Sequence, residues 1–181
     1  MGKFYLSLFG WKIDGGTPSV SKAVGIAYPH TSNWDLPFTL AICWALGLRI
    51  NWLGKTSLFK PPFGGIMKLV GGIPVVRSRS TNAVRAIAES LADLDEVLVI
   101  IPPEGTRSKS GRWKSGFYWI AVEAKIPLVL GYLDYPRKTG GFGKVFWPSG
   151  DIAADMEKIR AFYKGKEGKH PELQSTITLE D

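Results

Sequence analysis

His30 and Asp35 have the residue types of a general base and its carboxylate partner, and they lie five residues apart. An imidazole with an ordinary pKa near about 6.5 can take a proton from an alcohol when a carboxylate fixes its tautomer and stabilises the imidazolium. On a regular helix, residues five apart point in different directions, so the pair needs a bend. Ser32 and Asn33 suit the N-cap of a helix, which puts Asp35 in its first turn. We therefore predict that His30 lies in a loop and that the Asp35 carboxylate reaches back to it.

Two further polar stretches follow apolar runs. The first, GGIPVVRSR, carries Arg77 and Arg79. The second begins where VLVII ends and presents a turn of four residues, Glu104, Gly105, Thr106 and Arg107. A turn with a glycine, a hydroxyl and a guanidinium suits a phosphate, because backbone N–H groups approach closely and arginine donates two parallel hydrogen bonds. Taken alone, the arginine pair also fits a solvated edge, and the cations from Arg107 to Lys114 also fit a solvated loop.

The elements that must position these residues alternate between strands and helices. Strand patterns occupy residues 23–28, 50–54, 71–76, 97–101, 127–133 and 144–147, and helical patterns occupy residues 32–46, 81–91, 117–124 and 152–163. This alternation predicts an α/β fold for residues 1–181, a single domain with a mixed, mostly parallel β-sheet flanked by helices. Its active site is expected at the C-terminal ends of the strands. Residues 165–181 are polar and weakly patterned, and we expect their end to be loose.

Composition narrows the classes of partner. The 181 residues are 45% apolar, which suits one compact domain, and 23 Lys and Arg against 16 Asp and Glu give a net charge of +7. That charge favours phosphate-bearing metabolites, lipid headgroups or nucleic acid. The aromatic residues lie mostly in apolar strands and helices rather than between cations, which argues against nucleic acid. Cys43 is the single cysteine, so no internal disulfide forms, and we expect it to be buried in a protein of a reducing compartment.

Four ordered blocks resemble the glycerophospholipid acyltransferases, the family typified by 1-acyl-glycerol-3-phosphate acyltransferase. HTSNWD matches the family's HxxxxD block, and GGIPVVR resembles its glycine-rich strand ending in arginine. PEGTRS matches the third block, and IPLVLGY resembles the fourth. Pro29 stands where the family usually has Asn. The resemblance covers about residues 20–135.

The resemblance implies an O-acyltransferase in which His30 is the base, Asp35 orients it, and the acceptor is the hydroxyl of a lysophospholipid-type molecule. The alkoxide would attack an acyl thioester, from acyl-CoA or acyl-carrier protein, directly; this needs no enzyme nucleophile, metal or other cofactor, and no G-x-S-x-G elbow is present. The residues that the resemblance assigns to substrate binding are Arg77, Glu104, Gly105, Thr106 and Arg107. Two alternatives stay open: an acyl thioesterase that uses the same dyad on water, and a noncatalytic basic module that binds membrane.

Access to lipid is the last expectation. The apolar run 36–48 contains a proline and is shorter than the about 20 residues of a spanning helix, and no targeting signal is evident. If residues 4–11 are helical, Phe4, Leu8 and Trp11 share one face, which must be core or membrane contact. We expect a cytoplasmic protein, peripheral on the inner face of the membrane, that its positive charge attracts to anionic lipid.

Overall fold

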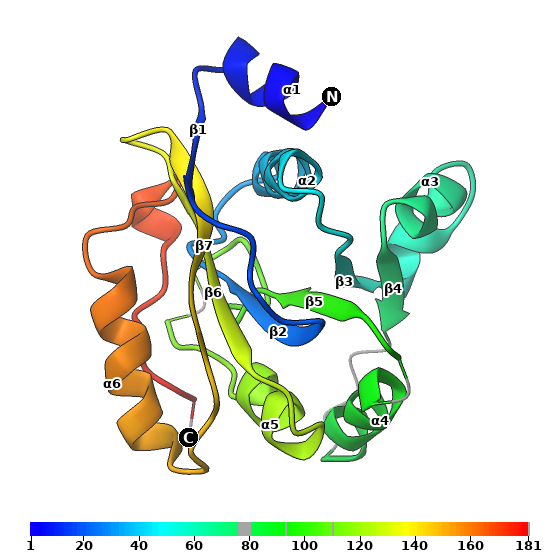
Figure 1. Ribbon diagram of the computed structural model, residues 1–181, viewed down its shortest axis with the longest axis vertical. Coiled ribbons are helices and arrows are strands. Elements are labelled where there is room, and N and C mark those ends of the chain that lie inside the picture. Colours follow the sequence, from blue (N-terminus) through cyan, green and yellow to red (C-terminus); the bar gives the residue numbers. More distant parts are fainter. Residues whose placement is uncertain (76–80, 93, 110, 181) are drawn as a thin grey trace.

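The central β-sheet holds the predicted site. The computed structural model describes residues 1–75, 81–92, 94–109 and 111–180. Within them, seven strands form one sheet in the order β1-β7-β6-β2-β5-β3-β4 (Figure 1). The strands are β1 (Lys12–Gly15), β2 (Lys22–Ala27), β3 (Asn51–Lys55), β4 (Gly72–Val75), β5 (Val97–Ile101), β6 (Leu128–Asp134) and β7 (Thr139–Phe146).

Most of the sheet is parallel, as the alternating pattern predicts. Strand β2 pairs in parallel with β5 on one side and β6 on the other, and Val24 is in register with both Val99 and Leu128. Strands β3 and β4 continue the parallel part, whereas β7 runs antiparallel to β6 and pairs in parallel with β1. The C-terminal ends of β2, β3, β4, β5 and β6 therefore share one edge. The predicted mixed, mostly parallel α/β fold is confirmed.

Helices cover both faces of the sheet (Figure 1). One hydrophobic cluster joins the sheet to α1 and α2, and a second joins its other face to α4, α5 and α6. Helix α3 follows the short 3₁₀ turn η1 and lies beside β4. The helices are α1 (Gly2–Leu8), α2 (Asp35–Ala45), η1 (Thr56–Phe59), α3 (Gly64–Leu69), α4 (Thr81–Ala92), α5 (Gly116–Glu123), α6 (Ile152–Tyr163) and η2 (Pro171–Leu173). Cys43 is fully buried in the α2 cluster, as expected, and burial raises the pKa of its thiol to about 12.

Strand β7 starts earlier than the sequence pattern indicates, and its partner β1 has no clear pattern at all. The glycines at the start of β7 conceal the strand, because they carry no side chains to alternate. They are needed where β1 approaches: a Cβ on Gly141 would lie 1.8 Å from the backbone oxygen of Asp14. Close backbone approach, rather than side-chain periodicity, defines this edge of the sheet.

The N-terminal segment corrects one expectation. Helix α1 ends at Leu8, and the chain turns at Gly10, whose φ of +70° favours glycine. Because of this turn, Trp11 packs into the core while Phe4 and Leu8 stay exposed. The three side chains therefore do not share a face: Trp11 belongs to the core, and Phe4 and Leu8 belong to the surface.

The C-terminal segment, residues 164–180, also differs from the expectation of a loose end. Ser175 is buried, and its carbonyl oxygen accepts a hydrogen bond of 2.9 Å from the Tyr28 hydroxyl. Farther along, the Trp113 amide donates to the Thr178 carbonyl at 2.7 Å. Contacts with residues far away in the sequence order this segment, and such contacts leave no local pattern.

Candidate active site

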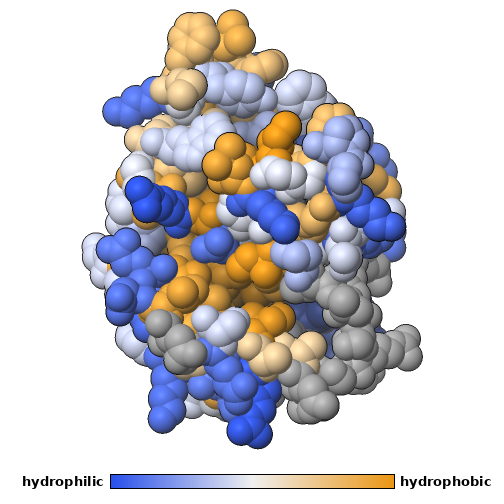
Figure 2. Space-filling model, turned by 90° about the vertical axis from the view of Figure 1, so that its right-hand side faces the viewer, coloured by the Kyte–Doolittle hydropathy of each residue, from blue (hydrophilic) through white to orange (hydrophobic). Residues whose placement is uncertain are grey.

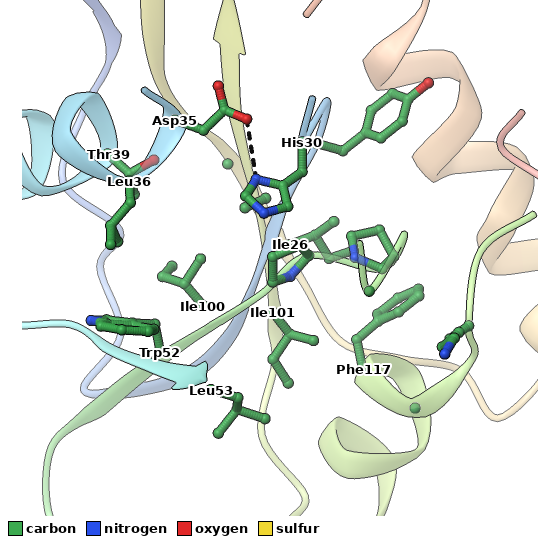
Figure 3. A pocket seen from close by; sticks show the side chains of 18 of the residues that line it. Ile26, His30, Asp35, Leu36, Thr39, Trp52, Leu53, Ile100, Ile101 and Phe117 are labelled. Carbon is green, nitrogen blue, oxygen red and sulfur yellow. Dashed lines mark ion pairs between the residues drawn. The ribbon is translucent and has the colours of Figure 1, made fainter. Parts of the chain in front are cut away.

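His30 lies in the loop that follows β2, as the sequence predicts. Residues 28–34, which we call the His30 loop, connect β2 to α2, and α2 begins at Asp35 rather than at Ser32. The His30 Nδ1 and Asp35 Oδ2 atoms are 3.1 Å apart. With the Nδ1 proton directed at this carboxylate, the lone pair is on Nε2, which faces into the pocket (Figure 3). The predicted contact between the two side chains is thus present.

Four donors hold the buried Asp35 carboxylate. Besides His30, the backbone amides of Thr31 and Ser32 each donate to Oδ2 at 2.9 Å. The Tyr135 hydroxyl donates to Oδ1 at 2.6 Å. Burial, followed by the negative charge of Asp35, raises the pKa of Tyr135, so its hydroxyl remains a donor at neutral pH. Asp35 therefore has a fixed orientation toward the imidazole.

Glu104 anchors the backbone of the same loop. Its side chain is buried, with the residue 1% exposed. Oε2 accepts a hydrogen bond of 2.7 Å from the His30 amide, and Oε1 accepts one of 2.9 Å from the Ser175 amide. Burial raises the pKa of Glu104, although these two hydrogen bonds oppose the shift. Both carboxylate oxygens thus accept hydrogen bonds from the protein. The sequence interpretation assigned Glu104 to substrate binding, and this role stays a prediction.

The rest of the predicted phosphate turn opens toward solvent. Gly105 has φ +65°, a conformation that favours glycine, and Arg107 is exposed. The Thr106 hydroxyl accepts a hydrogen bond of 3.2 Å from the Ser108 amide. Gly105, Thr106 and Arg107 all line the pocket that contains His30. The predicted site residue Arg77 and its neighbour Arg79 lie outside the described residues.

His30 and Asp35 stand at one end of a large pocket of about 1120 Å³. Farther from the dyad its walls are apolar, with Trp52 and Leu53 from β3 and Ile100 and Ile101 from β5 (Figure 3). Figure 2 shows hydrophobic surface, in orange, within a hollow of the face that carries β4 and α3. A polar reacting end and an apolar body suit a ligand with a long hydrocarbon chain. Among the described residues, no group of three or more His, Cys, Asp or Glu could hold a metal ion.

Sequence reasoning missed two residues of the site. Tyr135 comes directly after β6, so the rule that polar residues at strand ends form sites could have found it. Ser175 belongs to a weakly patterned segment, and no sequence signal connects it to Glu104.

Comparisons with known proteins agree with this architecture. The family model described as Acyltransferase matches residues 17–130, more than half of the chain. A 1-acyl-sn-glycerol-3-phosphate acyltransferase from Haemophilus influenzae is 29% identical over 140 residues, which cover 71% of this chain and 55% of the relative. The Escherichia coli protein of the same name is 28% identical over 131 residues, 67% of this chain and 52% of the relative. The chain thus spans about half the length of these two relatives.

A solved structure has the same fold. The crystal structure of the 1-acyl-sn-glycerophosphate acyltransferase PlsC from Thermotoga maritima matches with a TM-score of 0.57 and 19% identity. The match covers 89% of this chain and 71% of that chain.

Proposed function

Because the chain belongs to the acyltransferase family, we propose that it transfers a fatty acyl group from an acyl thioester to the hydroxyl of a lysophospholipid-type acceptor, with lysophosphatidate as the first candidate. The observation that carries this proposal is the contact of 3.1 Å between His30 and Asp35 at the polar end of an apolar pocket. The donor is acyl-CoA or acyl-carrier protein.

In the proposed reaction, His30 Nε2 takes the proton of the acceptor hydroxyl, and Asp35 stabilises the imidazolium that forms. The acceptor oxygen attacks the carbonyl carbon of the thioester, and a C–O bond forms. The tetrahedral intermediate then collapses, the C–S bond breaks, and the thiol leaves with the proton from His30. In these reaction steps the protein residues supply only proton transfer and positioning, so no covalent enzyme intermediate is needed.

The large pocket suggests where the acyl chain binds. Its apolar walls, which include Ile100, Trp52 and Leu53, extend away from the dyad (Figure 3). Burial of methylene groups against such walls contributes about 0.8 kcal/mol for each CH₂. We assign Arg107, which lines the same pocket, to the phosphate of the acceptor, because a guanidinium can donate two parallel hydrogen bonds to it.

The exposed apolar side chains support action at a membrane surface. Phe4 is 76% exposed and Leu8 is 69% exposed on α1, at the top of Figure 2, and Ile66 and Leu69 are exposed on α3. In Figure 1 these two helices lie on the same side of the molecule as α2. Within the part of the chain that the structure describes, no helix is long and apolar enough to cross a bilayer. We infer peripheral binding through these side chains, assisted by the charge of +7.

The deciding experiment incubates the purified protein with acyl-CoA, with and without lysophosphatidate, and measures thiol release and phosphatidate formation. Thiol release that requires the acceptor and equals product formation supports acyl transfer. Equal thiol release without acceptor would establish the thioesterase alternative. Absence of both reactions, while the protein still binds vesicles, would favour a noncatalytic membrane module. His30→Ala, with its fold checked by circular dichroism, should lower the transfer rate by about 10²- to 10⁴-fold.

A further inference from the structure

A second, smaller pocket of about 400 Å³ opens beside the His–Asp pair. It is lined by residues 31–34 of the His30 loop, by Arg107, and by Lys169, His170 and Leu173 of the C-terminal segment. We call it the outer pocket. Asn33 and Arg107 line both this pocket and the large pocket, so the two pockets are adjacent. A ligand whose hydroxyl reaches His30 can therefore place another group in the outer pocket.

The outer pocket has cationic walls and no acidic ones. Arg107 and Lys169 are cationic side chains, and among the described residues that line the pocket none is Asp or Glu. Within the described residues, neither cation has a carboxylate partner; the Lys169 Nζ atom instead lies 5.3 Å from the centre of the Trp34 ring. His170 Nδ1 is 3.5 Å from Glu172 Oε1, and both of these side chains are largely exposed. Two cations without a counter-charge at one pocket favour an anionic ligand.

Packing against the His30 loop fixes the segment that carries Lys169. The His170 amide donates to the Thr31 hydroxyl at 3.1 Å. Gly168 lies directly against the loop, since a Cβ there would be 2.5 Å from Thr31 Oγ1. Gln174 accepts from the Gly168 amide at 3.1 Å and donates to the Tyr28 hydroxyl at 2.8 Å. The position of Lys169 is therefore tied to the loop that carries His30.

We propose that the outer pocket binds a phosphate group of a substrate and that Lys169 provides its second cation beside Arg107. Lys169 lies beyond residues 17–130, the part of the chain that matches the family model. The inference rests on the proposed acyl transfer and deepens it. The phosphate can come from two sources, the phosphomonoester of the acceptor or the nucleotide phosphates of acyl-CoA.

Lys169→Gln tests this proposal, because it removes the charge and keeps most of the side-chain length. The matched control is Lys164→Gln in the same segment, which is exposed and does not line the pocket. If the phosphate is that of the acceptor, K169Q should raise the KM for lysophosphatidate about three- to tenfold and leave the KM for monoacylglycerol unchanged. If it is that of the donor, the KM should rise for acyl-CoA and stay unchanged for acyl-pantetheine. Unchanged KM values for all four substrates in folded K169Q, or equal changes in K164Q, would overturn the proposal.

Binding of inorganic phosphate provides a readout that does not depend on acyl transfer. Isothermal titration of the intact protein at constant ionic strength should give weaker phosphate binding for K169Q than for wild type and K164Q. If the wild type transfers no acyl group but shows this difference, the proposed function fails and the phosphate site stands. If transfer proceeds and K169Q binds phosphate and both substrates like the wild type, the site fails and the function stands.

Discussion

Replacement of Glu104 by Gln tests whether this buried carboxylate holds the His30 loop or binds the substrate. The amide keeps one acceptor oxygen, so one of the two hydrogen bonds, to the His30 amide or to the Ser175 amide, is lost. A hydrogen bond to a charged group contributes about 1.5–3 kcal/mol, and removal of a buried charge offsets part of that loss. We expect a net destabilisation of about 1–2 kcal/mol, which lowers Tm by about 2–8 °C in a chain of this size.

The effect on catalysis should be larger than the effect on stability. A reacting group displaced by about 1 Å can lose about 10²-fold in rate, and Glu104 holds the backbone at His30 itself. We expect kcat for acyl transfer to fall about ten- to hundredfold while both KM values stay within about twofold. Steady-state kinetics and thermal unfolding of the same preparations measure both quantities, with the exposed Glu167→Gln as the control. A rise in the acceptor KM with unchanged kcat would refute the positioning role and support substrate contact.

Three further outcomes are expected. Tyr135→Phe removes the donor to Asp35 Oδ1, so its Tm should fall by about 3–10 °C and kcat should fall less than in H30A; an unchanged Tm would contradict the hydrogen-bonded geometry. Because burial raises the pKa of Glu104, the Glu104 carboxyl keeps its proton to a higher pH in the folded protein than in the unfolded chain. The free energy of unfolding should therefore decrease as pH rises from the unfolded pKa of this carboxyl to its folded pKa. Denaturation across this pH range should show that slope in the wild type and not in E104Q. Phe4→Ser with Leu8→Ser should weaken sedimentation with anionic vesicles without lowering Tm, whereas a large loss of Tm would assign both side chains to the core.

The parts of the fold that could be predicted are those with local periodicity. The run VLVII forms β5, and the helical spacing of Val84, Ile87 and Leu91 forms α4. Strand β1 and the start of β7 could not be predicted, because their pairing depends on backbone approach at Gly141 rather than on side chains. The face of α1 could not be predicted either, since Gly10 turns the chain before Trp11.

The same distinction applies to the site. His30 and Asp35 are close in the sequence, so the bend between them could be inferred from the intervening residues. Tyr135 and Ser175 approach the dyad only through tertiary structure, at separations of 100 residues from Asp35 and 71 residues from Glu104. Its motif identified Glu104 as a candidate site residue. Its burial and its hydrogen bonds to two backbone amides result from tertiary packing, which no local sequence pattern indicates.

The C-terminal segment has a consequence for the order of events during synthesis. The amide that completes the pairing of Glu104 belongs to Ser175, and Thr31 is contacted by His170. While residues 164–180 are still inside the ribosome, the segments that contain His30 and Glu104 have already emerged, but the loop between β2 and α2 lacks these contacts. The entropy cost of joining two distant residues rises only slowly with the number of residues between them. The late contacts of Ser175 with Glu104 and of His170 with Thr31 therefore cost little more than contacts closer in the sequence. The surroundings of the His30–Asp35 pair are therefore complete only after residues 164–180 have emerged, and a nascent chain that lacks this segment does not yet hold the His30 loop through these contacts.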